Sequence, residues 1–145
     1  MKVKQLSVFV ENQPGRLAAV AKTLGAAGIN IMAMTIAETR EFGVVRMIIA
    51  DGDKGMAVLK GAGFTVTTTD VLAIEVMNRP GALAKVLGVF EKQGLNVEYM
   101  YAFVAKREDA AILVFRFDDT EKAVKALKGT EVKVLTSEEV VSLEK

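Results

Sequence analysis

The sequence contains no cysteine, no histidine and no tryptophan, and only two prolines among its 145 residues. Without cysteine the chain has no disulfide framework, no thiol nucleophile and no cysteine-type zinc or iron–sulfur site. Without histidine it has no Ser-His-Asp triad and no imidazole acid–base catalyst. A magnesium or calcium site would have to be built from carboxylates. These absences exclude the catalytic and metal-binding classes that depend on the two residues, and we expect no cofactor.

Long apolar runs and charge of one sign are also missing. The longest apolar run, Tyr99–Ala105, is far shorter than the roughly 20 residues that span a bilayer. The chain has 19 basic and 18 acidic side chains, well mixed along the sequence. No run of Lys and Arg gives the basic surface that nucleic acids need, and residues 1–11 are too short and interrupted to act as a secretion signal. We therefore expect a cytoplasmic protein with no membrane or nucleic-acid partner.

The sequence instead contains an internal repeat. When residues 12–31 are aligned with residues 78–97, without a gap, 8 of the 20 positions are identical. The identical pairs include both prolines, two glycines and two asparagines of each segment. Such a repeat predicts two copies of one structural unit. We place the units at residues 1–70 and 71–145, with no linker between them.

Each unit shows the same order of patterns. In the first unit, strands are expected at 6–10, 30–39, 42–50 and 64–69, and helices from the Pro14-Gly15 turn to Gly28 and at 53–62. In the second unit, strands are expected at 71–77, 97–106, 110–117 and 132–135, and helices at 81–93 and 120–128. Residues 137–143 fit either a short helix capped by Ser137 or an added strand. The order is that of a ferredoxin-like βαββαβ unit in the α+β class, with both helices on one face of the sheet.

The expected strands are apolar on both faces. Along residues 42–50, Val45, Met47 and Ile49 lie on one face, and the other carries mostly apolar residues around Arg46. Sheets that are apolar on both faces are covered on both faces, and the helices cover only one. A second copy of the chain is the simplest cover, so we expect a homodimer. Arg46 and Arg116 are expected to pair with Glu38 or Glu98 across an interface, or to bind a carboxylate.

The two repeated Pro-Gly turns combine features of an anion site. The first N–H groups of a helix lack backbone partners, and the helix dipole favours a negative charge beside them. Glycine lets a ligand approach the backbone, and an asparagine two residues before the proline can both donate and accept hydrogen bonds. The same residues are equally compatible with helix caps and ordinary turns, which a duplicated gene would copy as well.

The residues Asn-x-Pro-Gly-x-Leu, a helix and then Gly-Ile/Leu-Asn-Ile/Val resemble the ACT domain, a small regulatory module that binds amino acids. The resemblance covers both units. It implies ACT-like units packed side by side into an eight-stranded antiparallel sheet with the helices on one face. It also implies that a small amino acid binds at the interface of the two units, between the Pro-Gly loop of one unit and the start of the second strand of the other.

The resemblance implies two ligand-binding sites. Asn12, Gly15, Arg16 and Leu17 would form one site with Asn96 and Val97. Asn78, Gly81, Ala82 and Leu83 would form the other with Asn30 and Ile31. Arg16 against Ala82 makes the two sites unequal. Serine-responsive members of the family often have a histidine shortly before the motif, which this chain lacks.

Two functions fit this sequence. The first is a non-enzymatic regulatory protein that senses a small amino acid. The second is a regulatory subunit that docks on an amino-acid biosynthesis enzyme, similar to the small subunit of acetolactate synthase. An enzyme on a ferredoxin-like scaffold, similar to acylphosphatase, is a weaker fit because no nucleophile and base are visible together.

Overall fold

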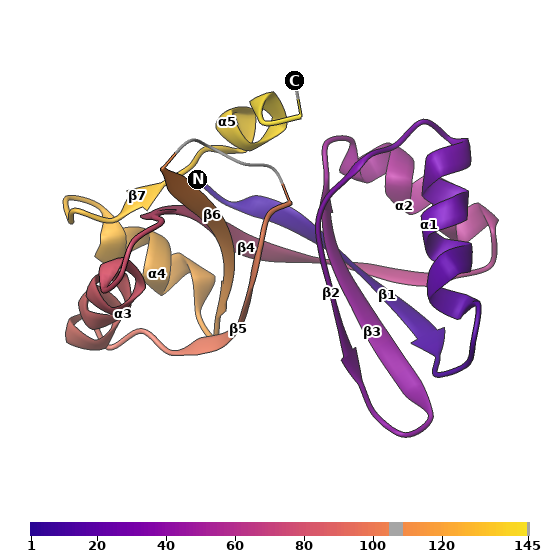
Figure 1. Ribbon diagram of the computed structural model, residues 1–145, viewed down its shortest axis with the longest axis horizontal. Helices are drawn as coiled ribbons and strands as arrows, with labels where there is room; N and C mark the ends of the chain where they lie inside the picture. The colour runs from indigo at the N-terminus through magenta and orange to yellow at the C-terminus, as the bar shows by residue number, and fades with distance from the viewer. Residues whose placement is uncertain (105–108, 145) are drawn as a thin grey trace. The chain divides into compact units, whose positions relative to one another are not determined.

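The computed structural model describes residues 1–104 and 109–144 of the chain (Figure 1). These residues form two compact units. We call residues 4–69 the N-terminal unit, and residues 1–3 together with 70–143 the C-terminal unit. The two units are described separately below.

The N-terminal unit has the order βαββαβ. Its elements are β1 (Val3–Glu11), α1 (Arg16–Ala26), β2 (Ile31–Glu38), β3 (Phe42–Ile49), α2 (Gly52–Gly61) and the first part of β4 (Thr65–Met77). Strand β3 pairs antiparallel with both β1 and β2, and Met47 lies opposite Leu6 on one side and Met34 on the other. Both helices pack on one face of the strands, over a core that includes Phe64 and the fully buried Leu6, Leu24, Met47 and Leu59.

The C-terminal unit repeats this order and adds one helix. Its elements are the second part of β4, α3 (Ala82–Lys92), β5 (Val97–Ala102), β6 (Ala110–Phe117), α4 (Thr120–Leu127), β7 (Lys133–Val134) and α5 (Ser137–Ser142). Strand β6 pairs antiparallel with β4 and β5, and β7 pairs with β4. In the core, the Phe90 ring meets the rings of Phe115 and Phe117 edge to face, each at 5.1 Å between centroids.

The expected α+β class and the two βαββαβ units are confirmed, but the expected number of strands is wrong. The described residues form seven strands rather than eight, in the hydrogen-bonded order β2-β3-β1-β4-β6-β5 with β7 also on β4. The two strands expected at 64–69 and 71–77 are one continuous strand, β4. No glycine or proline interrupts this segment, and its Thr67-Thr68-Thr69 run favours extended backbone straight through Asp70.

The ends of several elements differ from the sequence-based expectation. Residues 137–142 are helical, and the cap is Thr136 rather than Ser137: the Thr136 hydroxyl accepts from the Glu139 N–H while the Glu139 carboxylate accepts from the Thr136 N–H. Strand β5 ends at Ala102, and the last two residues of the strand expected at 97–106 lie outside the described residues. Among the helices that the structure describes, none is long and apolar enough to cross a membrane.

Candidate functional site

The two Pro-Gly segments form the same turn in both units. Gly15 has φ 86° and ψ −12°, and Gly81 has φ 84° and ψ −13°. The N–H of Arg16 donates to the Gln13 carbonyl at 3.3 Å, and the N–H of Ala82 donates to the Arg79 carbonyl at 3.2 Å. This is the geometry of a type II turn, which takes proline at its second position and glycine at its third. The helices therefore begin one residue after the glycine, and the prolines lie in the turn rather than in the helices.

The helices that follow these turns begin without side-chain caps. Neither α1 nor α3 has a capping hydrogen bond or an acidic residue in its first turn. The second helix of each unit is different, because Asp51 caps α2 by accepting from Lys54 N–H and Asp119 caps α4 by accepting from Lys122 N–H. An uncapped helix start leaves its N–H donors and the positive end of its dipole available to an anion.

The asparagines of the motif have different positions relative to the turns. The Asn12 side chain donates to the carbonyls of Thr39 and Arg40 in the β2–β3 hairpin, at 3.2 and 3.3 Å. Asn12 therefore holds the Pro-Gly loop to that hairpin. Its backbone N–H also donates to the Glu41 carbonyl at 2.9 Å, and the backbone N–H of Asn78 makes the equivalent bond to the Asp109 carbonyl at 2.7 Å. Asn30 lies beyond the other end of α1, an 11-residue helix about 16 Å long. No single unit brings Asn30 to its own Pro-Gly turn.

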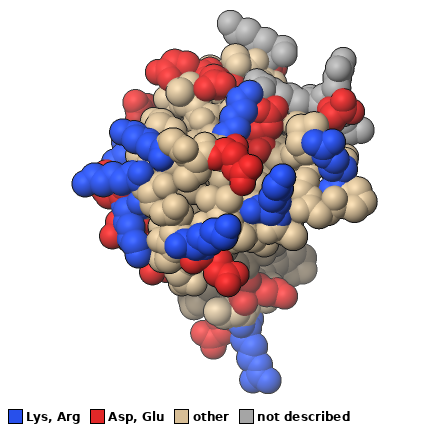
Figure 2. Space-filling view, turned by 90° about the vertical axis from the view of Figure 1, so that its left-hand side faces the viewer, with Lys and Arg blue, Asp and Glu red and all other residues tan. Residues whose placement is uncertain are grey.

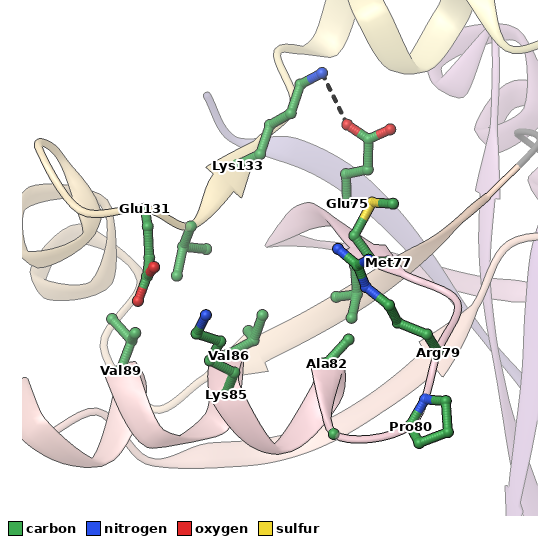
Figure 3. Close-up of a pocket in the computed structure, with 13 residues that line it drawn as sticks. Glu75, Met77, Arg79, Pro80, Ala82, Lys85, Val86, Val89, Glu131 and Lys133 are labelled. Carbon is green, nitrogen blue, oxygen red and sulfur yellow. Dashed lines mark ion pairs between the residues drawn. The ribbon is translucent and has the colours of Figure 1, made fainter.

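A cavity of about 550 Å³ lies beside the second turn, entirely within the C-terminal unit (Figure 3). It lies between the end of β4, the start of α3 and the segment that leads into β7. The residues that line it are Glu75, Val76, Met77, Arg79, Pro80, Gly81, Ala82, Lys85, Val86, Val89, Glu131, Val132 and Lys133. Its volume falls within the range of small-molecule pockets, about 300–1,000 Å³.

The cavity combines apolar walls with charges of both signs. Valines from β4, α3 and the segment before β7 form the walls, and Val76 and Val132 are almost fully buried. At the rim, Lys133 and Glu75 form an ion pair at 2.8 Å, which Figure 3 shows above the cavity. Arg79 and Lys85 add positive charge and Glu131 adds negative charge. Such a site matches a small zwitterion better than a simple anion or cation.

The cavity includes only part of the predicted site. Gly81 and Ala82 line it, whereas Leu83 is exposed on the surface of α3, as Leu17 is on α1. The sequence reasoning missed the charged lining residues. One signal was present for Lys85: with Ala82, Val86 and Val89 it forms an i, i+3, i+4, i+7 set on one face of α3. The charged residues next to β7 carry no such pattern.

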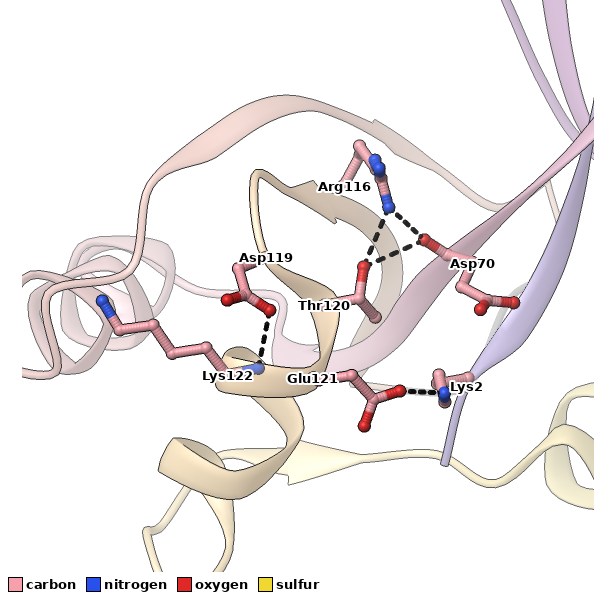
Figure 4. A network of polar contacts seen from close by, with 7 residues as sticks. All are labelled: Lys2, Asp70, Arg116, Asp119, Thr120, Glu121 and Lys122. Carbon is pink, nitrogen blue, oxygen red and sulfur yellow. Dashed lines mark hydrogen bonds and ion pairs between the residues drawn. The ribbon is translucent and has the colours of Figure 1, made fainter.

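A polar network near the start of α4 accounts for Arg116 (Figure 4). Arg116 donates to the Asp70 carbonyl at 2.9 Å and to the Thr120 hydroxyl at 2.8 Å, and it forms an ion pair at 3.3 Å with Glu98 on β5. The expected pairing with Glu98 is therefore present, but between neighbouring strands of one unit. This guanidinium ties β4, β5, β6 and α4 together.

In the same region, Lys2 donates to Glu121 at the start of α4 (Figure 4). The hydrogen bond, and then the charge of Lys2, lower the pKa of Glu121 below its ordinary value. The same contacts raise the pKa of Lys2.

Across residues 1–104 and 109–144, no group of three or more acidic side chains is arranged to hold a metal ion. On the face shown in Figure 2, acidic and basic side chains are interspersed.

The fold and the turns together define the class: an α+β protein built from two βαββαβ units, each with a type II Pro-Gly turn before its first helix. The chain belongs to the family of ACT domain pairs, whose sequence model matches residues 1–143. Among curated proteins, no relative matches the chain.

Solved structures with the same fold include one at substantial sequence identity. Protein BT0572 from Bacteroides thetaiotaomicron is 41% identical, with a TM-score of 0.90 over 97% of this chain and 96% of that one. The regulatory subunit of aspartate kinase from Thermus flavus is 18% identical, with a TM-score of 0.61 over 86% of this chain and 88% of that one. The ligand-free regulatory subunit from Thermus thermophilus is 16% identical, with a TM-score of 0.59 over 88% and 91%. At identities this low, the likeness between this chain and the two kinase subunits concerns the fold alone.

Proposed function

We propose that this protein is a non-enzymatic regulatory protein that binds a small amino acid. The observation that carries the proposal is the second Pro-Gly turn, where an uncapped helix start opens beside a cavity whose rim holds both signs of charge. The carboxylate of an amino acid suits the N–H groups and positive dipole of α3, and its ammonium suits the acidic side chains at the rim. Membership of the ACT domain pairs supports the same function.

The predicted residues divide into two groups in this proposal. One group comes from the turns: Asn12, Gly15, Arg16 and Leu17, and Asn78, Gly81, Ala82 and Leu83. The other group, Asn30, Ile31, Asn96 and Val97, lies at the starts of β2 and β5. Because α1 and α3 separate the two groups within each unit, the second group would come from another unit, in this chain or in a second copy.

Binding of this kind suits regulation. Coupling between a ligand and a distant response is typically about 1–3 kcal/mol, which is far below what catalysis requires. A chain without cysteine or histidine also lacks the usual nucleophile–base pairs. We therefore assign the amino acid a signalling role, with a conformational or oligomeric response as the output.

A second candidate function is a regulatory subunit that docks on a biosynthetic enzyme. One observation favours a docking surface: Phe9 and Phe42 are 45% and 55% exposed on the helix-free face of the N-terminal unit. The fold likeness to aspartate kinase regulatory subunits agrees with this function. Co-purification of an enzyme with the tagged protein at stoichiometric amounts would favour it, whereas purification of the protein alone with ligand-dependent stability would favour the sensor.

A thermal-shift screen of the twenty amino acids tests the proposed function. A ligand at about 100 times its dissociation constant adds about 2.7 kcal/mol to the free energy of unfolding. We expect one amino acid or a few related ones to raise the melting temperature in a concentration-dependent way. If none of the twenty does so at millimolar concentration, the proposal is wrong.

A further inference from the structure

The two units differ at the position where the cavity lies. Arg16 in the N-terminal unit corresponds to Ala82 in the C-terminal unit, because each directly follows the glycine of the turn. Phe64 corresponds to Val132, because each directly precedes the last strand of its unit. A long side chain and an aromatic ring thus occupy the positions that alanine and valine occupy in the other unit.

In the N-terminal unit, these two side chains pack against each other. The guanidinium of Arg16 stacks on the Phe64 ring, 5.2 Å from its centroid. Val20, on the next turn of α1, is fully buried, whereas its counterpart Val86 on α3 is only half-buried and lines the cavity. The Nε of Arg16 is itself buried, without a hydrogen-bond partner among the described residues. We call this contact between Arg16 and Phe64 the plug of the N-terminal unit, because it lies at the position that corresponds to the cavity of the C-terminal unit.

In the C-terminal unit, the open cavity defines the chemistry of its occupant. Val76, Val86, Val89 and Val132 offer an apolar surface that is buried or half-buried. A charged or strongly polar side chain placed against this surface would lose its hydration without finding a partner. A branched aliphatic side chain would instead gain about 25 cal/mol for each Å² removed from water.

The charges at the rim define the other end of the occupant. Arg79 and Lys85 lie near the start of α3, and Glu131 approaches from the segment before β7, as Figure 3 shows. A carboxylate near α3 would face the helix start and both cations, and an ammonium would face Glu131. A fatty acid would supply only the first charge and an alkylamine only the second.

We infer that the C-terminal unit alone carries an open site and that this site takes an α-amino acid with an aliphatic side chain. This inference rests on the proposed function and adds to it the class of ligand, the Pro-Gly turn that carries the open site and the number of such sites per chain. The ligand side chain would pack on the valines, and its charged end would lie between Lys85 and Glu131.

Calorimetric titration of the full chain with L-leucine, L-isoleucine and L-valine tests the inference. We expect at least one of them to bind with one site per chain, and L-serine and L-lysine to bind at least tenfold more weakly. Leucine analogues that lack the ammonium (4-methylpentanoate) or the carboxylate (3-methylbutylamine) should also bind at least tenfold more weakly. A stoichiometry of two per chain would contradict the single open site.

Substitutions that copy the plug of the N-terminal unit give the sharper test. Ala82→Arg, alone and combined with Val132→Phe, should reduce the affinity for the aliphatic amino acid at least tenfold. Ala26→Arg, which adds the same charge at an exposed position in the last turn of α1, should leave the affinity unchanged. Glu131→Gln keeps the shape of the cavity. It should weaken the binding of leucine and leave the binding of 4-methylpentanoate unaffected. This variant tests the site even if Ala82→Arg does not fold.

The possible failures are distinguishable. If the protein binds none of the twenty amino acids, both the proposed function and this inference are wrong. If it binds an amino acid with an affinity that neither Ala82→Arg nor Glu131→Gln changes, the proposed function stands and the cavity is not its site. If only polar or charged amino acids bind, and Ala82→Arg blocks them, the position is right and the aliphatic class is wrong.

Discussion

At the scale of single residues, one lysine in each unit connects the two helices of that unit. Lys54, in the first turn of α2, donates to the Ala27 carbonyl at the end of α1 at 2.9 Å. Lys122, in the first turn of α4, donates to the Gly94 carbonyl just past the end of α3 at 3.0 Å. Each lysine thus places a positive charge at the negative end of a helix and satisfies a carbonyl that the helix leaves unpaired.

Lys54→Met should therefore lower the free energy of unfolding by about 0.5–1 kcal/mol, because it removes an exposed charge-assisted contact at a helix end. Urea denaturation measures this change. Lys22→Met, which removes an exposed lysine from the middle of α1, is the matched control and should change stability by less than about 0.5 kcal/mol. Equal losses in the two variants would contradict the role of Lys54.

The contact between Lys2 and Glu121 makes a pH-dependent contribution. The hydrogen bond from Lys2 holds the pKa of Glu121 below its ordinary 4.5, so the stabilisation is present above about pH 4.5 and is lost as the pH falls through the lowered pKa. Glu121→Gln should be less stable than the parent at pH 6, and the difference should shrink as the pH falls through the lowered pKa, at low salt. Glu138→Gln, at an exposed position in α5, is the control. A difference that stays constant as the pH is lowered would contradict this assignment.

At the scale of elements, the Pro-Gly turn sets where α1 and α3 begin. Gly81 has φ 84°, a region that residues with a Cβ rarely adopt, although the space around a Cβ there is open. Any cost of a larger residue is therefore a backbone cost rather than a clash. The same holds for Gly15, with φ 86°.

Gly81→Ala should destabilise the protein by about 1–2 kcal/mol because it forces alanine into the left-handed region. Gly88→Ala is a matched control within the same helix, since Gly88 has helical backbone and open space around its Cβ. That control should gain up to about 1 kcal/mol from better helix propensity. Opposite signs for the two variants in urea denaturation would confirm the turn, and a loss in both would contradict it.

The helices, strands and turns also show which features of this fold can be predicted from the sequence. The helices and strands follow from apolar periodicity, and the two turns, though not their type, follow from the Pro-Gly pairs, because both signals are local. The continuous strand through Asp70 was missed because the repeat suggested a boundary where nothing breaks the backbone. The equivalence of Lys54 with Lys122 was missed because these residues are 68 positions apart, whereas the turns are 66 apart.

The cavity was missed for a different reason. It depends on Arg16 stacking on Phe64 in one unit and on Ala82 and Val132 leaving that space open in the other. These residues are distant in sequence, and only folding brings them together. The sequence showed that Arg16 and Ala82 differ, and from this it predicted unequal sites, but it could not show which neighbour each would meet.

At the scale of the whole molecule, the apolar surface formed by Phe9 and Phe42 bears on assembly. Phe9 lies on β1 opposite Val44, and Phe42 begins β3, both on the face that α1 and α2 leave uncovered. Exposed aromatic side chains grouped in this way are typical of interfaces. We expect a second copy of the chain to cover them.

Phe9→Ser combined with Phe42→Ser should therefore convert a dimer into a monomer, which light scattering at micromolar concentration measures. Leu87→Ser combined with Val141→Ser, two exposed apolar residues on α3 and α5, is the control and should remain dimeric. A parent protein that is already monomeric at these concentrations would contradict the dimer.

The central claim is that the chain binds a small amino acid through the turn that begins α3. Titration calorimetry of the purified protein with the amino acid selected by the thermal-shift screen tests it most directly, with Asn78→Ala compared with the parent. We predict saturable binding that Asn78→Ala weakens by about 1–3 kcal/mol, the scale of a lost hydrogen bond to a charged group. Absence of heat for all twenty amino acids, or binding that substitutions at Asn78, Gly81 and Ala82 all leave unchanged, would contradict the claim.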